Sequence, residues 1–106
     1  MDMREVNEKD WKLFKSKVPG WQRAYMDRLN QSYIALLQGE KAPDEKFWEL
    51  EKRIRQDKNN PGVLIDMRRS EMYLNLIALF NNDVITLNDL DGFSDDVIEI
   101  VKHFSE

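Results

Sequence analysis

Residues 8–38 read EKDWKLFKSKVPGWQRAYMDRLNQSYIALLQ, and this stretch decides the fold class. Its large apolar residues recur at steps of three and four, the spacing of one face of a helix. They are Trp11, Phe14, Val18, Trp21, Tyr25 and Leu29. The rhythm continues across Pro19 without changing phase, so we expect either one helix kinked near Pro19 or two nearly coaxial helices. Gly39 suits the left-handed residue that closes this segment.

A second helix is predicted from Pro43 to about Lys58. Proline is favoured at the first helical position, and the acidic residues Asp44 and Glu45 follow in the first turn, where the helix dipole favours them. The apolar stripe of this helix is Phe47, Leu50 and Ile54, with Trp48 on its flank. Glutamates and arginines four residues apart occupy the opposite face, which predicts helical ion pairs.

Asn59-Asn60-Pro61-Gly62 breaks the helical pattern, and Pro-Gly fits the middle of a type II turn. The next helix is predicted from about Leu64 to Asn81. Its segment Met72 to Phe80 is apolar on nearly every side, which indicates either a central helix or a face kept for a partner.

The last part of the chain carries two helix-start signals. Thr86 and Asp89 fit a capping box at a short helical turn, and Ser94 fits the cap of the final helix. Phe93 can pack onto Ile98 there, and the expected buried stripe is Val97, Ile100, Val101 and Phe104. The predicted fold class is therefore all-α: a compact bundle of four to five helices, forming a single domain over residues 1–106.

Composition narrows the class of protein. The 106 residues include 42% apolar and 34% charged side chains and no cysteine, which favours a folded chain in water without disulfides or zinc–thiolate sites. The longest apolar run, residues 76–80, is far shorter than the roughly 20 residues of a membrane-spanning helix. With no signal-like apolar segment near Met1, we expect a cytoplasmic protein that does not bind membranes.

The residues needed for chemistry are sparse. His103 is the only histidine, and it lies near the end of the chain, where a cation in the last helical turn complements the helix dipole. Asp89-Leu90-Asp91-Gly92 looks like part of a calcium loop, but the required first and twelfth positions hold Leu87 and Ile98. The glycines stand apart, so no phosphate loop forms. We expect no enzyme activity, no cofactor, no metal and no small-molecule substrate.

Charge is distributed unevenly along the chain. Residues 1–39 carry a net charge of +2, residues 40–80 are neutral, and residues 81–106 carry −6. Six cations lie between Lys52 and Arg69, and we expect the turn at Pro61 to bring the two helix ends that carry them together. Such a cluster could contact phosphate groups. The low pI of about 5.1 disfavours nucleic acid and leaves an ordinary charged surface or a protein contact as the main alternatives.

One segment carries a resemblance to other proteins. Residues 47–58, FWELEKRIRQDK, followed by Pro61-Gly62-Val63, Val84-Ile85 and Phe93-Ser94-Asp95, resemble a group of short proteins from anaerobic gut bacteria. Some members are automatically labelled multidrug transporters, which the lack of a membrane-spanning run here contradicts. The resemblance implies a bacterial, cytoplasmic protein and brings no functional residues with it.

These features predict a non-catalytic module that binds another protein or forms a homodimer. The alternative is a nucleic-acid-associated regulator that uses the basic helix ends between Lys52 and Arg69. Core packing is the default expectation for the three tryptophans, and an exposed one would be a candidate anchor. The candidate partner-binding residues are Trp48, Arg53, Arg55, Arg68, Arg69, Met72, Asp89, Asp91, Asp95 and Asp96.

Overall fold

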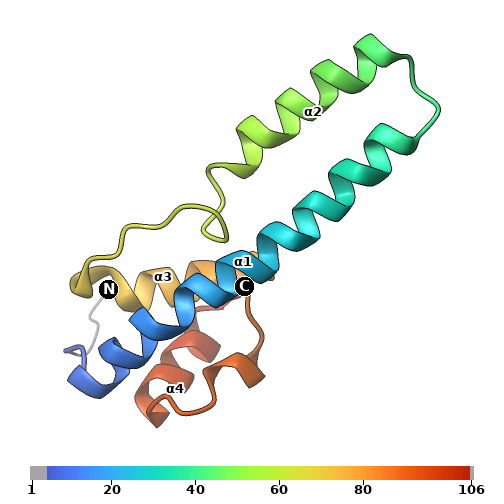
Figure 1. The fold of residues 1–106 in the computed structure, drawn as a ribbon. Coiled ribbons are helices and arrows are strands. Elements are labelled where there is room, and N and C mark those ends of the chain that lie inside the picture. The colour runs from blue at the N-terminus through green and yellow to red at the C-terminus, as the bar shows by residue number, and fades with distance from the viewer. Residues whose placement is uncertain (1–4, 106) are drawn as a thin grey trace.

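The structure is a computed structural model that describes residues 5–105, and helices account for its regular elements (Figure 1). The four α-helices are α1 (Glu8–Gln38), α2 (Pro43–Asp57), α3 (Met72–Asn81) and α4 (Asp95–Phe104). Two short 3-10 helices, η1 (Arg69–Glu71) and η2 (Leu87–Leu90), precede α3 and α4. The predicted all-α fold with a long first helix is confirmed.

The first helix runs unbroken through Pro19. Asn7 caps it, because its side-chain oxygen accepts hydrogen bonds from the backbone N–H groups of Lys9 and Asp10 at 2.8 and 3.4 Å. Pro19 lies on the exposed side of the helix. The alternative of two separate helices is therefore wrong. Gly39 ends α1 in an extended conformation, with φ −72° and ψ −173°, so the predicted left-handed ending is also wrong.

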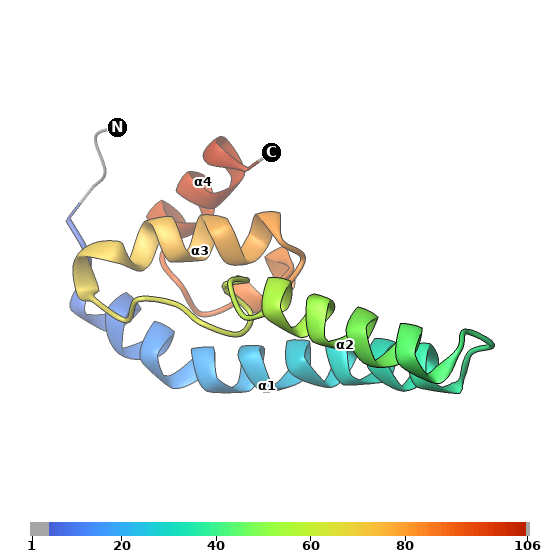
Figure 2. The same cartoon turned by 90° about the horizontal axis from the view of Figure 1, so that it is seen from above.

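The second helix begins and ends where the sequence predicts. Pro43 occupies the first turn together with Asp44 and Glu45, and Lys58 is the C-terminal cap. Helix α2 runs antiparallel to the C-terminal half of α1, and the two form a hairpin (Figures 1 and 2).

The connection after α2 differs from the prediction. A turn does form at Pro61-Gly62, where the Val63 N–H donates to the Asn60 carbonyl at 2.8 Å. Gly62 does not have the positive φ of a type II turn. A Cβ atom at this position would overlap the ring of Tyr25, so glycine is needed there for the close approach of the backbone.

Helix α3 begins at Met72, eight residues later than predicted. Residues 64–68 have no helical structure and lead from the base of the hairpin to the far end of the core (Figure 2). The side chain of Asn75 donates to the carbonyl of Asp66 at 2.7 Å and holds this segment against α3. The tertiary path of the chain thus overrides the helical pattern around Leu64.

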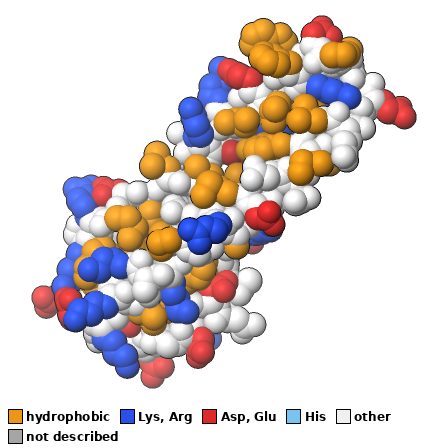
Figure 3. Space-filling model, in the orientation of Figure 1, with side chains coloured by type: hydrophobic (Ala, Val, Ile, Leu, Met, Phe, Trp, Pro, Cys, Tyr) orange, Lys and Arg blue, Asp and Glu red, His pale blue; other side chains and the backbone are white. Residues whose placement is uncertain are grey.

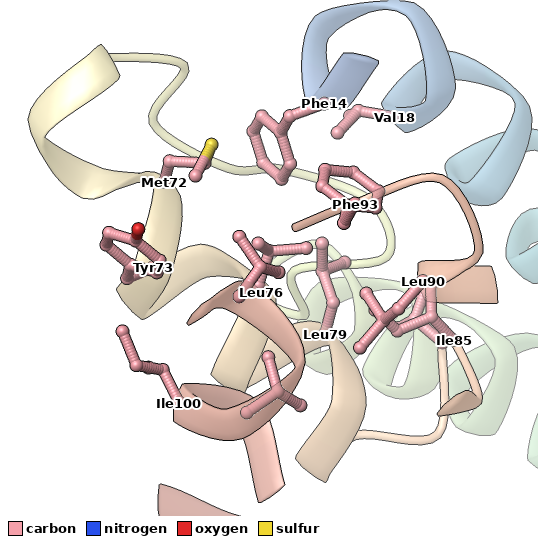
Figure 4. Packing of buried hydrophobic residues seen from close by; sticks show 13 residues of the cluster. Phe14, Val18, Met72, Tyr73, Leu76, Leu79, Ile85, Leu90, Phe93 and Ile100 are labelled. Carbon is pink, nitrogen blue, oxygen red and sulfur yellow. The ribbon is translucent and has the colours of Figure 1, made fainter. Parts of the chain in front are cut away.

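The hydrophobic core lies between the first half of α1, α3, η2 and α4 (Figure 4). Phe14 and Val18 of α1 meet Leu76 and Leu79 of α3 there, together with Phe93. The predicted buried stripe of α4 is confirmed for Val97, Ile100 and Val101, while Phe104 is partly buried against the core.

A buried carboxylate joins α1 to the start of α4. Asp10 is 2% exposed and accepts hydrogen bonds from the Ser94 backbone N–H and hydroxyl at 2.9 and 2.7 Å. Ser94 caps α4 as predicted, because its hydroxyl oxygen accepts from the Val97 N–H. Gly92, just before it, has φ +92°, a conformation that favours glycine.

The hairpin extends well beyond this core (Figures 1 and 2). The molecule measures 52 × 24 × 22 Å with a radius of gyration of 16.4 Å, against roughly 13 Å for a compact chain of this length. We call the part of α1 from Met26 onward, together with α2, the arm. Leu36 is buried within the arm, whereas α2 contains no buried residue.

Candidate partner-binding surface

Two aromatic side chains near the start of α2 are largely exposed. Phe47 is 63% exposed and Trp48 is 66% exposed, and their rings meet edge-to-face with centroids 5.1 Å apart. Core packing, the default expectation for the tryptophans, is therefore wrong for Trp48. Trp11 and Trp21 are partly buried against the core, in agreement with that expectation. Trp48 is left as the candidate anchor among the three.

Apolar side chains from both arm helices share one face, which we call the hairpin face: Met26, Tyr33 and Leu37 of α1 with Phe47 and Ile54 of α2. Steps of seven and four residues place the α1 members on one side of their helix, and a step of seven does the same for α2. Met26, Leu37 and Ile54 are 38%, 46% and 39% exposed. Figure 3 shows hydrophobic side chains gathered along the arm, with charged groups at the margins.

A hollow of about 280 Å³ opens between the two helices near the base of the arm. Met26, Leu29 and Tyr33 line it from α1, and Ile54 and Asp57 line it from α2. The Tyr33 hydroxyl donates to Asp57 Oδ2 at 2.5 Å. Burial, followed by this hydrogen bond and the charge of Asp57, raises the pKa of Tyr33 to about 12. Tyr33 therefore stays protonated near neutral pH and joins the two helices.

The arginines of the predicted basic cluster are paired within the chain. Arg53 binds Glu49 at 3.1 Å and Arg55 binds Glu51 at 3.4 Å, both in the helical spacing that the sequence predicts. Arg68 binds Asp66 at 2.5 Å, and this hydrogen bond lowers the pKa of Asp66. Such partners reduce the positive potential available to a phosphate backbone.

The arginines of the predicted basic cluster are also divided between two distant places, so the expectation of one cluster is wrong. Arg69 pairs with Glu8 and donates to the Val6 carbonyl at 2.8 Å, at the start of α1. Arg53 of α2 lies near Tyr33, which is far along α1 from Glu8, and the charge of Arg53 acts on the pKa of this tyrosine. The 25 residue steps from Glu8 to Tyr33 correspond to roughly 37 Å of helix.

Met72 is unavailable for binding, because it is fully buried in the core. The apolar segment after it is mostly core as well, and Leu74, 48% exposed, is its one largely exposed large apolar residue. Of the two predicted alternatives for this segment, a central helix or a face kept for a partner, the central helix is therefore correct.

The acidic candidates include residues that start helices. The Asp89 carboxylate accepts from the Thr86 backbone N–H at 2.7 Å and from its hydroxyl at 3.2 Å, which completes the predicted capping box. Asp95 and Asp96 lie in the first turn of α4, and Asp91 is exposed just after η2. Helix-start chemistry thus explains three of these four carboxylates.

The single histidine of the chain lies outside the arm. His103 is exposed on the last turn of α4 and stacks edge-to-face on Phe104, with ring centroids 4.6 Å apart. Within residues 5–105, histidines and carboxylates form no group of three that could hold a metal ion. The helices of this region also include none with the length and apolarity to cross a bilayer.

The chain matches no family model, no curated protein and no solved structure.

All five residues of the hairpin face were absent from the sequence-based candidates: Met26, Tyr33, Leu37, Phe47 and Ile54. A signal for part of the set exists in the sequence. Residues 29–39, LNQSYIALLQG, carry no charge, although 34% of the chain is charged. Such an uncharged stretch in a helix that leaves the core indicates an apolar face.

Proposed function

We propose that this chain is a non-catalytic protein-interaction module that binds its partner through the hairpin face and the adjoining Trp48, whose ring contacts Phe47. One observation carries the proposal: adjacent aromatic residues, Phe47 and Trp48, are 63% and 66% exposed on a helix without a buried residue. Aromatic residues provide much of the binding energy at protein interfaces, and tryptophan is enriched among the dominant ones.

The extent of the apolar surface supports the same function. Leu37 of α1, 46% exposed, adds to the apolar surface on the other helix of the arm. Isolated exposed apolar residues are ordinary, but a contiguous group on one elongated element is typical of an interaction site. A protein partner would remove this area from water.

The experiment is a pull-down from host lysate that compares the wild-type chain with the double variant Phe47→Ser, Trp48→Ser. Because both side chains are exposed, the variant should fold with an unchanged circular-dichroism spectrum and lose the captured protein. Leu74→Ser, which changes an exposed apolar residue of α3, is the matched control and should keep it. Equal capture by the wild-type chain and the double variant would contradict the proposal.

A nuclease-treated sample separates this function from the nucleic-acid alternative. Capture through the hairpin face should survive nuclease, and it should survive Arg68→Ala, Arg69→Ala. Binding that disappears with nuclease and falls steeply with salt would instead indicate contacts to phosphate between Lys52 and Arg69.

A further inference from the structure

We propose that the partner of the hairpin face is the same face of a second copy of this chain, with the two arms antiparallel in a four-helix arrangement. This inference rests on the proposed function, because it names the partner of the same surface. Closed two-fold pairs are the commonest oligomers, and they require a surface that is complementary to itself.

The hairpin face contains both a projection and a hollow. Phe47 stands near the tip of the arm, 63% exposed, and the hollow of about 280 Å³ lies toward the base, bounded by Met26, Tyr33 and Ile54. Seven residues separate Phe47 from Ile54, or roughly 10 Å along α2. In an antiparallel pair, Phe47 of each copy therefore lies over the hollow of the other.

The exposed apolar area of the arm is in keeping with the area that each partner covers in a dimer. At the 150–250 Å² that one aromatic side chain can bury, Phe47 and Trp48 together leave about 250 Å² to cover. Met26, Leu37 and Ile54 add to this area on both helices. A standard interface covers about 800 Å² per partner. A partner with two parallel rows of apolar residues covers both rows, and the hairpin face itself has that form.

Charge along α2 favours the antiparallel orientation. Asp44 and Glu45 lie in its first turn, while Arg55 and Lys58 lie at its end. Asp44 and Lys58 are fourteen residues apart, which places them on one side of the helix, next to Phe47. Antiparallel packing brings Asp44 of one copy toward Lys58 of the other, whereas parallel packing brings like charges together.

The first test is the mass of the chain in solution, measured by sedimentation equilibrium over a concentration series. The wild-type chain should show a monomer–dimer equilibrium. Phe47→Ser and Ile54→Asp should each raise the dimer dissociation constant by about tenfold or more. Leu74→Asp should leave that constant unchanged, and circular dichroism should show that all variants are folded. A wild-type chain that stays monomeric at the highest concentration would overturn the inference.

The second test uses cysteine cross-linking, which is clean because the chain has no cysteine of its own. An oxidised mixture of the Asp44→Cys and Lys58→Cys chains should form a mixed disulfide dimer. Each variant alone should cross-link much less. Efficient cross-linking of Asp44→Cys to itself would overturn the antiparallel arrangement.

Failure of this inference differs from failure of the proposed function. A monomeric chain whose capture of another protein depends on Phe47 and Trp48 keeps the function and overturns the second copy as partner. A dimer that forms equally well with Phe47→Ser and Ile54→Asp overturns this inference alone, because the pull-down with the double variant tests the proposed function separately.

Discussion

Asp10 joins two helices through a single carboxylate. It is buried, and both of its oxygens accept hydrogen bonds from Ser94, which itself caps α4. A buried donor without an acceptor is costly, so the position of α4 on the core depends on this residue.

Asp10→Ala should lower the free energy of unfolding by about 1–3 kcal/mol, because it leaves the Ser94 N–H and hydroxyl without their acceptor. Urea denaturation measures this loss. Asp27→Ala, at an exposed carboxylate of the same helix, is the control and should change stability by less than about 0.5 kcal/mol. Equal effects of the two variants would refute the role of Asp10.

Alanine substitutions at two glycines should have opposite effects on stability. Gly62→Ala should destabilise the fold by about 1–3 kcal/mol, because the added methyl overlaps the Tyr25 ring. Gly20→Ala should stabilise it by about 0.5–1 kcal/mol, because that Cβ meets no atom within 4 Å and alanine favours the interior of α1. Thermal melts of both variants give the signs. A melting temperature of Gly62→Ala at or above that of the wild type would be inconsistent with the close approach.

At the scale of the elements, the arm is held together by Tyr33 and Asp57 as well as by Leu36. The phenol donates only while it keeps its proton, so alkaline pH breaks this hydrogen bond. Its contribution is fully present below pH 10, the pKa of an unperturbed tyrosine, and is lost as the pH rises toward about 12.

Tyr33→Phe removes this titration and serves as the reference. We expect the wild-type chain to lose stability relative to Tyr33→Phe between pH 10 and about 12, the pH range set by the raised pKa. Urea midpoints of the two chains across this range measure the difference. Asp57→Asn should lower the pKa of Tyr33 and so narrow the pH range over which stability is lost. Parallel curves for the wild type and Tyr33→Phe would show that the phenol keeps an ordinary pKa.

The helix boundaries were predictable where a local signal marks them. Pro43 and Ser94 begin α2 and α4 at the predicted places, because a proline at the first turn and a capping serine act within a few residues. The start of α3 was not predictable, because the segment around Leu64 must reach the far end of the core. The exposure of Trp48 was not predictable either, since an amphipathic pattern is the same whether a helix covers its own core or a partner.

At the scale of the whole molecule, stability should be unequal between the core and the arm. Helices α3 and α4 contribute seven of the thirteen buried residues of the core cluster, whereas α2 contributes none. Local opening requires less free energy where few apolar contacts are lost.

Hydrogen exchange should show this difference directly. The amides of α2 should exchange faster than those of α3 in dilute solution, and their protection should rise with protein concentration as a second copy covers the hairpin face. The amides of α3 should show little dependence on concentration. Protection of α2 equal to that of α3 in the dilute monomer would contradict an arm of low stability.

Because α1 is one continuous helix, core and arm share it, yet the arm can change length without any change in the core. Seven added residues in each arm helix, on either side of the connection at Gly39, would move the tip by roughly 10 Å and return nearly the same helix face to the same side. The arm therefore has a natural unit of length, seven residues in each helix. Arms that differ by whole heptads would differ in reach and still carry their apolar residues on the same side.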